Sequence, residues 1–355
     1  MWKTIEYTGD IMPEILDMTI EYYGKDNDIS KCEFIEHEYF GNLAGKAVIK
    51  LAYDEEKQVL AGQYIVIPMR VKIGDKIYPV ILSLNTLTRA AYRGQKIFIT
   101  LAEAVYRECA MAGYKFCYGA PNPNSHPGFL KKLSFRDAGV MPLFLKIIHP
   151  SRLVKEKLKF SLLELLSSPF NLIFHLYRKA TKTQVIEITK ENVSLIDIFW
   201  NGNKDKYEVI GVRDSGYILW RYLNMPCREY KIFAACEGEN IVGYVIGRIT
   251  EVAGMSCGML VDFMVEKGMQ DAAMSMLKCI EQYFYSTKVG LMGCLMQKHF
   301  EEAAYLRKLG FFECPKFLEP QPFPIIYREF NEYPGNEKMN DFSNWFFTMG
   351  DYDVI

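Results

Sequence analysis

Apolar residues recur along the chain at two spacings, which predict helices and strands in mixed order. Apolar positions three or four apart indicate amphipathic helices, and alternating or short continuous apolar runs indicate strands. In the first half we expect helices at residues 12–23, 31–40, 97–112 and 128–133. We expect strands there at residues 47–52, 59–66, 78–87, 116–119 and 140–148.

The second half repeats this order. The expected helices span residues 192–200, 215–223, 269–285 and 300–309, and the expected strands span 232–235, 241–249, 258–265 and 291–295. Two copies of one order form a weak internal repeat. The pattern therefore predicts a mixed α/β (α+β) fold with two domains of one architecture, each a mostly antiparallel sheet flanked by helices.

A basic, apolar segment separates the two halves. Residues 151–182 hold seven Lys or Arg against Glu156 and Glu164, with leucine and phenylalanine clusters between the basic ends and a break at Pro169. One interpretation is a helical linker packed across both domains. The other is an interfacial helix that contacts anionic lipid, which would place the protein peripherally at a membrane.

Composition narrows the class of protein. The 355 residues suit two domains on the usual prior of about 150 residues each. The 42 basic and 43 acidic residues give no argument for a nucleic-acid partner. No signal peptide and no apolar run of about 18 residues are present, so a cytoplasmic protein is expected. The nine cysteines form no CxxC pair, so we expect neither a metal site nor a disulfide framework.

The densest chemical signal lies at residues 84–98, where a strand enters a loop that contains Gly94 and a long helix follows. Such a turn leaves the first N–H groups of the helix free at the positive end of its dipole. This is a seat for a diphosphate. Arg93 and Lys96 would add positive charge for the same anion.

These residues resemble a known family. The stretch from Thr88 through Tyr92-Arg93-Gly94 to Leu101 is similar to the pyrophosphate loop of the GNAT N-acyltransferases, which bind acyl-CoA. Residues 121–135 resemble the family's Asn-rich loop and closing "kLGF" motif, and residues 305–311 are a better copy of that motif. Residues 241–244 resemble its "ivGy" strand, and residues 219–223 match a WRY-type helix of tandem GNAT proteins.

The resemblance implies acetyl-CoA as co-substrate and two GNAT-like domains with splayed central strands. It places the backbone N–H of Leu87 at the developing oxyanion. The residues that it assigns to acyl-CoA are Leu87, Thr88, Arg93, Gly94, Gln95, Lys96, Ile97, Phe98, Asn122, Asn124 and Phe129.

The chain departs from the family at defined places. Lys96 stands where the family usually has Gly, and Phe98 stands where it usually has Gly or Ala. Leu130 and Leu306 stand where many members have a tyrosine that protonates the departing thiolate. Residues 266–271, Glu-Lys-Gly-Met-Gln-Asp, occupy the loop position of the second half and lack the arginine. We therefore expect acyl-CoA to bind the first half and not the second.

Three regions offer a general base. Glu36, His37 and Glu38 lie in a row on the second predicted helix, where GNAT folds bind the acceptor, and Glu38 is the candidate kept. His126 lies in the loop beside the expected thioester and titrates near neutral pH. The aromatic, acidic tail offers Asp351 or Asp353. Each also has a structural interpretation: a solvated helix face, a histidine bonded to backbone, and a docked tail.

The sequence thus predicts an N-acyltransferase that acetylates the amine of a small polar acceptor such as an amino sugar, as in tandem GNAT proteins associated with surface polysaccharide. A catalytically silent CoA-binding sensor or scaffold, and a Fem-type aminoacyl transferase, remain alternatives. The expected divisions are an acyl-CoA-binding domain at 1–150, a basic linker at 151–183, a degenerate GNAT-like domain at 184–332 and a tail at 333–355. The oligomeric state is not predicted.

Overall fold

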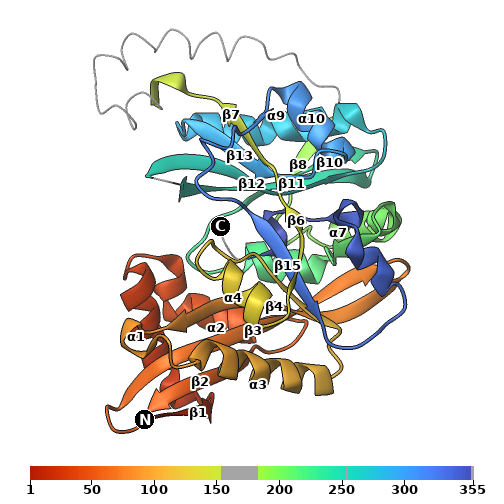
Figure 1. Cartoon of the computed structure of the whole chain (residues 1–355). Coiled ribbons are helices and arrows are strands. Elements are labelled where there is room, and N and C mark those ends of the chain that lie inside the picture. The colour runs from red at the N-terminus through yellow and green to blue at the C-terminus, as the bar shows by residue number, and fades with distance from the viewer. Residues whose placement is uncertain (153–182, 253, 353–355) are drawn as a thin grey trace.

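The computed structural model describes residues 1–152, 183–252 and 254–352. The described chain is built on two sheets, one of nine strands and one of seven, that lie one above the other in Figure 1. The expected linker at 151–182 lies almost wholly outside the described residues. Among the described residues, no helix is long and apolar enough to cross a membrane.

The first sheet has the order β1-β2-β3-β4-β5-β15-β6, with β9 paired to β3 and β16 paired to β9. Its strands are β1 (Trp2–Glu6), β2 (Val48–Asp54), β3 (Val59–Ile73), β4 (Lys76–Thr88), β5 (Phe116–Gly119), β6 (Arg136–Val140), β9 (Val209–Gly211), β15 (Pro324–Glu329) and β16 (Trp345–Phe346). Its helices are α1 (Met12–Tyr23), α2 (Cys32–Phe40), α3 (Ile97–Met111) and α4 (His126–Lys132).

The second sheet has the order β14-β7-β13-β12-β11-β10-β8. Its strands are β7 (Leu143–Ile147), β8 (Gln184–Glu187), β10 (Lys231–Glu237), β11 (Asn240–Val252), β12 (Met255–Val265), β13 (Leu291–Leu295) and β14 (Phe312–Glu313). The helices of this half are α7 (Leu195–Asn203), α8 (Ser215–Ile218), α9 (Gln270–Ser286) and α10 (Glu301–Leu309), and a π-helical turn, η5 (Leu219–Leu223), continues α8.

The two halves share one plan, which confirms the predicted mixed α/β fold with two GNAT-like domains. In each, a long antiparallel hairpin (β3–β4 or β11–β12) leads into a long helix (α3 or α9). A strand parallel to the hairpin follows (β5 or β13), and then a shorter helix (α4 or α10). In Figure 1, α3 and α9 cover the outer faces of their sheets.

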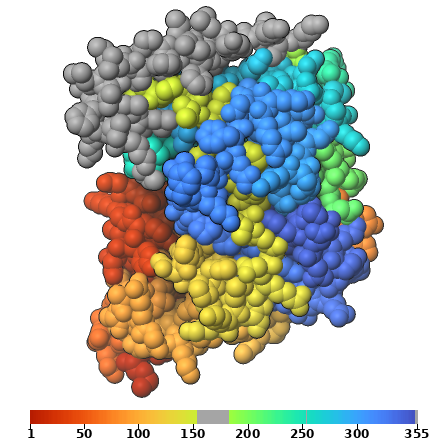
Figure 2. Space-filling view, turned by 45° about the horizontal axis from the view of Figure 1, so that its top comes forward, coloured from red at the N-terminus to blue at the C-terminus, as the bar shows by residue number. Residues whose placement is uncertain are grey.

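The halves exchange one strand each. β7 leaves the first half and pairs with β13 and β14 of the second sheet, and β15 returns from the second half to lie between β5 and β6. Figure 2 shows the yellow segment of the first half running between blue segments of the second. The strand expected at 140–148 is β7, which begins only at Leu143. Sequence analysis did not predict β6, which ends at Val140 and lies in the other sheet. The domain divisions expected from sequence remain a prediction.

Local signals set many element ends. Pro13 lies in the first turn of α1, where its missing N–H costs nothing, and Gly24 ends the helix at φ 88°. Gly310 ends α10 at φ 99° in the left-handed region. α1, β5 and β13 match their predicted bounds, whereas β3 continues seven residues beyond the predicted strand.

One apolar core connects the halves. It includes buried side chains of the first sheet, of the second sheet and of the chain's last described segment. Trp345, Phe346, Phe347 and Met349 are all at least 96% buried in this core. The aromatic tail therefore docks inside the molecule, as one of its two interpretations predicted. A second, smaller core lies under α3.

Candidate functional site

The loop between β4 and α3 has a defined shape. A short 3-10 turn at Ala90–Tyr92 follows β4, and Tyr92 anchors it by donating a hydrogen bond from its hydroxyl to Asp54 Oδ2 at 2.8 Å. Gly94 has φ 82°, and Lys96 precedes the helix at φ 63° and ψ 11°. Since L-residues other than glycine pay about 1–2 kcal/mol in this region, the structure explains why a glycine is usual at the position of Lys96.

Six consecutive backbone N–H groups at this loop are not engaged. Among the described residues, none of the amides of residues 94–99 donates a hydrogen bond, and the first helical bond runs from Thr100 N to Lys96 O at 3.0 Å. These amides stand at the start of the 15-residue helix α3. An anion is favoured there by both the free donors and the helix dipole.

The three basic residues of the loop have different environments. Arg89 is turned back onto the protein: its Nε donates to Leu60 O at 2.8 Å and its guanidinium pairs with Asp17 and Glu21 of α1. Arg93 is exposed and its Nη2 lies 3.4 Å from Tyr22 Oη. Lys96 is exposed as well. Arg93 and Lys96 are therefore the cations free to meet a ligand at the amides.

Phe98 joins the beginnings of α3 and α4. Its ring lies edge-on to Phe129 at 5.2 Å between centroids and 5.9 Å from Tyr64. A Cβ at Gly128 would lie 3.3 Å from the Phe98 ring, so glycine permits this close approach. Phe129 itself is 94% buried. Phe98 and Phe129 thus form a packed floor between the helices, a role that differs from direct contact with phosphate.

The Asn-rich loop prepares the start of α4. Asn122 Oδ1 accepts hydrogen bonds from the backbone N–H groups of Asn124 and Ser125, each at 3.0 Å. Asn122 is therefore a capping residue of the turn, whereas Asn124 is exposed. Thr88, the last residue of β4, is half-buried, and Leu87 is buried.

The central strands part beside this loop. The parallel ladder between β4 and β5 consists of Ile81 with Cys117 and Leu82 with Tyr118, and β4 continues unpaired with β5 as far as Thr88. β12 and β13 behave in the same way, since their ladder ends at Leu260 and β12 continues to Val265. Each half therefore has splayed central strands, as the resemblance predicted.

The three candidate bases have distinct partners. Glu38 is fully buried on α2, and its Oε1 lies 3.6 Å from Arg221 Nη1. His126 Nε2 lies 2.6 Å from Asp137 Oδ1 of β6. Asp351 Oδ2 accepts from Arg213 Nη2 at 2.5 Å and from Thr348 N at 2.8 Å. The histidine is thus bonded to a carboxylate and not to backbone, and both carboxylate candidates pair with arginine.

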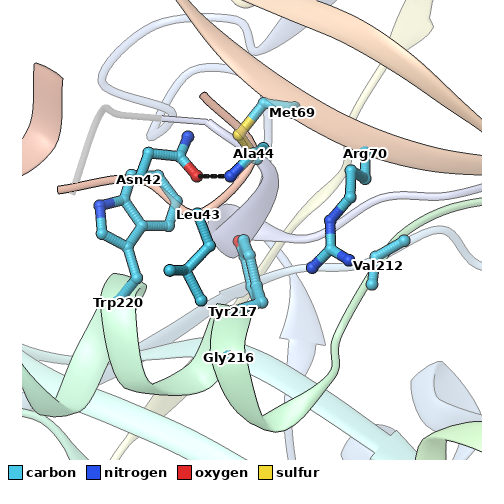
Figure 3. A pocket seen from close by; sticks show the side chains of 9 residues that line it. All are labelled: Asn42, Leu43, Ala44, Met69, Arg70, Val212, Gly216, Tyr217 and Trp220. Carbon is cyan, nitrogen blue, oxygen red and sulfur yellow. Dashed lines mark hydrogen bonds between the residues drawn. The ribbon is translucent and has the colours of Figure 1, made fainter. Parts of the chain in front are cut away.

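Of the row Glu36, His37 and Glu38, only Glu36 is exposed, so the three do not form a solvated face. His37 Nε2 lies 2.8 Å from Trp220 O, and Trp220 Nε1 donates to His37 O at 3.2 Å. These reciprocal contacts fasten α2 to the π-helical turn of the second half. Figure 3 shows the adjoining crevice, where Trp220 and Tyr217 face Asn42 and Leu43. Its volume of about 10 Å³ is far below that of a ligand site, so this crevice is a packing seam.

A buried ionic network fills the parting of strands in the second half. Arg213 is 99% buried; its Nε donates to Asp262 Oδ2 of β12 at 3.0 Å, and its Nη2 reaches Asp351 of the tail. Tyr244 Oη donates to the same Asp262 oxygen at 3.1 Å. Burial raises the pKa of the Asp262 carboxyl, and the Arg213 charge opposes that rise. The tail, through Asp351, therefore helps to fill the parting between β12 and β13.

The loop of the second half is engaged by the protein. Gly268 has φ 81°, close to that of Gly94, yet its N–H faces Glu301 Oε2 at 3.4 Å. The N–H groups of Met269 and Gln270 donate to Glu266 O and Gly268 O. A carboxylate of the chain itself thus occupies the place of an anion.

Sequence reasoning missed Gln63, Arg213 and Arg221. Arg213 and Arg221 are buried charges whose partners lie far along the chain, and Gln63 is a polar residue in an apolar strand. The signal available for Gln63 was its place inside the run Leu60–Pro68. Arg221 lies in the stretch 219–223 that resembles a WRY-type helix, but no local pattern indicated its buried partner, and none pointed to Arg213.

Comparison with known proteins agrees with this geometry. Residues 4–137 match the family described as Acetyltransferase (GNAT) domain. The first half is thus similar to a GNAT domain. The match covers less than half of the chain, and a sequence search of curated proteins found no relative.

Solved structures extend the likeness of fold to both halves. A probable N-acyltransferase of Enterococcus faecalis is 13% identical, with a TM-score of 0.64 over 93% of this chain and 73% of that one. A GCN5-related N-acetyltransferase of Anabaena variabilis is 11% identical, with the same TM-score and coverage. The N-myristoyltransferase of Saccharomyces cerevisiae with bound myristoyl-CoA is 10% identical, with a TM-score of 0.62 over 92% and 82%. The solved structures show a shared fold, and the family match of residues 4–137 supports a GNAT-type N-acyltransferase with acyl-CoA as co-substrate.

Proposed function

We propose that the chain transfers an acyl group, acetyl in the first instance, from acyl-CoA to the amine of a small polar acceptor. The observation that carries this proposal is the row of unengaged amides at residues 94–99, with Arg93 and Lys96 exposed beside it. The diphosphate of CoA is the anion whose size and charge suit such a row. Leu87, Thr88 and Asn124 would line the path of the pantetheine.

The reaction is a direct displacement. The neutral amine nitrogen attacks the thioester carbonyl carbon, and the carbonyl oxygen becomes an oxyanion that a backbone N–H near Leu87 receives. The C–S bond then breaks, the base takes a proton from the nitrogen, and the departing thiolate is protonated. The products are an amide and free CoA, and no enzyme-bound acyl group forms.

Among the candidate bases, His126 is the one whose partner leaves it able to accept a proton. A histidine held by a carboxylate is oriented for proton transfer, as in other base dyads. Glu38 and Asp351 each pair with a buried arginine, so their carboxylates already have a partner in the protein. We therefore rank His126 first and regard Asp351 as an anchor of the tail.

The acceptor class rests on resemblance. The sequence motifs are the basis for three parts of the proposal: an amino sugar as acceptor, a role in surface-polysaccharide synthesis, and the assignment to tandem GNAT proteins. Contact of residues 151–182 with a membrane and a cytoplasmic location are also proposals. A Fem-type aminoacyl transferase is less favoured because the chain keeps the Arg93-Gly94 loop.

Calorimetric titration with acetyl-CoA tests the donor site. Arg93→Ala is expected to weaken binding at least about tenfold, because charge-assisted hydrogen bonds contribute about 1.5–3 kcal/mol. Arg107→Ala is the matched control, since Arg107 is an exposed arginine farther along α3. Equal affinity of wild type and the Arg93 variant would remove the assigned site.

A thiol-release assay with a panel of amines tests turnover. Amine-dependent release of CoA supports an enzyme. Tight CoA binding without release for any amine would instead support a CoA sensor, which Leu130 at the usual place of the acid and the arginine-paired carboxylates also favour.

A further inference from the structure

A bulge interrupts β4 just before the candidate loop. Ile65 of β3 pairs with Leu84, but Gln63 pairs with Leu87, so β4 holds one residue more than β3 over this stretch. Asn85, inside the bulge, has φ 47°. A bulge removes backbone groups from the ladder and re-aims them, and a positive φ at a non-glycine residue must be held by its surroundings.

Two side chains hold this bulge. Gln63 is 99% buried, and its Nε2 donates to Asn85 O at 2.9 Å. Asn85 Nδ2 in turn donates to Tyr39 Oη of α2 at 2.9 Å. The bulge is therefore fastened to β3 on one side and to the helix that covers it on the other. Its backbone cannot relax without the loss of one of these bonds.

One polar atom of Gln63 lacks a hydrogen-bond partner among the described residues. This atom, Oε1, is buried. A buried amide oxygen without a donor costs about 1–3 kcal/mol. Such an atom in a native structure calls for an explanation, and a hydrogen-bond donor of a bound ligand is one.

The second half has a similar bulge, but its polar side chain already has protein partners. Ile246 pairs with Asp262 and Gly247 with Leu260, so β12 also holds an extra residue. There the polar group is Asp262, which Arg213 and Tyr244 already engage. Of these two bulges, the first is held by a side chain, Gln63, whose Oε1 has no partner among the described residues. The second has Asp262, which is engaged.

We propose that Gln63 is a positioning residue for acyl transfer. By holding Asn85 O, it fixes the bulge of β4 so that a backbone N–H beside Leu87 points at the thioester oxygen, and its Oε1 accepts a hydrogen bond from a donor of the bound substrate. The inference rests on the proposed function, because it assigns Gln63 to the same displacement at the same strand.

Two substitutions separate shape from hydrogen bonding. Gln63→Met keeps the length of the side chain but neither donates nor accepts strongly. Gln63→Glu keeps the shape and the acceptor, but its carboxylate cannot donate to Asn85 O. Both variants are expected to lower kcat about 10- to 100-fold, with KM for acetyl-CoA changed less than about threefold, because the lost interaction acts in the transition state.

Hydrogen exchange of the protein without ligand gives a readout independent of turnover. Amides of residues 84–88 should exchange faster in both variants than in wild type, since the bulge loses its bond to β3. Gln297→Met is the matched control: Gln297 is also buried, and its Nε2 donates to Phe342 O and Trp345 O at 2.7 Å each. Its exchange effect should fall on the tail and not on residues 84–88.

The outcomes are distinguishable. Reduced kcat together with faster exchange at 84–88 supports the proposal. Wild-type kcat in both variants, with turnover intact, overturns it and leaves the proposed function standing. A wild type that releases no CoA with any amine overturns the function, and the positioning role with it. A Gln63→Glu variant that keeps wild-type kcat would show that donation to Asn85 O is not needed.

Discussion

Single residues decide which half of this molecule can accept an anion. In the first half, Gly94 and the amides after it face no protein partner among the described residues. In the second half, Gly268 has nearly the same backbone conformation, but Glu301 supplies a carboxylate to its N–H. A similar loop is therefore open in the first half and engaged in the second, where Glu301 meets one amide and backbone carbonyls meet the next two.

Arg213 is the residue whose loss should cost the most. Because it is buried between Asp262 and Asp351, Arg213→Met leaves two buried carboxylates without their cation. We expect a loss of about 3–5 kcal/mol in the free energy of unfolding at neutral pH. Urea denaturation measures it, and Arg107→Met serves as the exposed control.

The same variant should show a particular dependence on pH. The pKa of Asp262 is already raised in the folded state by burial, so its ionised form opposes folding and its protonation as pH falls favours the native state. Without Arg213 that pKa rises further. The gap in stability between wild type and variant should therefore narrow as pH falls from 7 towards 5. A constant gap would show that Asp262 and Asp351 do not depend on Arg213.

The residues of the loop between β4 and α3 could be predicted from the sequence, whereas those of the buried ionic network around Arg213 could not. Gly94, Arg93 and Lys96 lie within a local pattern of strand, glycine and helix, which the chain encodes over a dozen residues. Arg213 pairs with residues 49 and 138 positions away. A side chain whose partner is that distant gives no periodic or spaced signal, so sequence reading named Asp351 as a base and missed the arginine that holds it.

At the scale of elements, the exchange of β7 and β15 makes the halves depend on each other. β15 lies between β5 and β6, so without it the first sheet would expose two unpaired strand edges. Helices α1 and α3 and strands β5 and β13 could be read from local periodicity and bounding glycines. β15 could not, because its partners lie about two hundred residues earlier.

Ile326→Pro tests this dependence. Ile326 is fully buried and pairs with Gly119 on one side and Asp137 on the other. Proline there removes a ladder donor from a central strand, and we expect a loss of at least about 3 kcal/mol. Phe312→Pro, in the two-residue edge strand β14, should cost less.

Urea unfolding followed by circular dichroism and by tryptophan fluorescence checks the result. Coincident transitions at lower urea are expected, since one core joins the halves. Separate transitions, with one half unaffected by Ile326→Pro, would contradict the dependence of each half on the other.

At the scale of the whole molecule, the two similarly folded halves differ in their loops: the amides are open in the first half and engaged in the second. The tail docks into the parting of strands of the second half through Arg213, and its last described residues reach the first half, where Tyr118 Oη donates to Asp351 O at 2.9 Å. Arg221 Nη2 donates to Tyr352 O at 2.7 Å beside Glu38. The tail thus contacts both halves, and under the proposed function the first half holds the acyl donor while the second half supports the tail.

Amide NMR of the deuterated, ¹⁵N-labelled chain titrated with CoA tests the central claim most directly. The account predicts large shifts at the backbone amides of residues 94–99, where the diphosphate accepts their hydrogen bonds, and none of that size at Gly268, Met269 and Gln270. Unchanged amides at 94–99 under saturating CoA, or equal shifts in both loops, would contradict it.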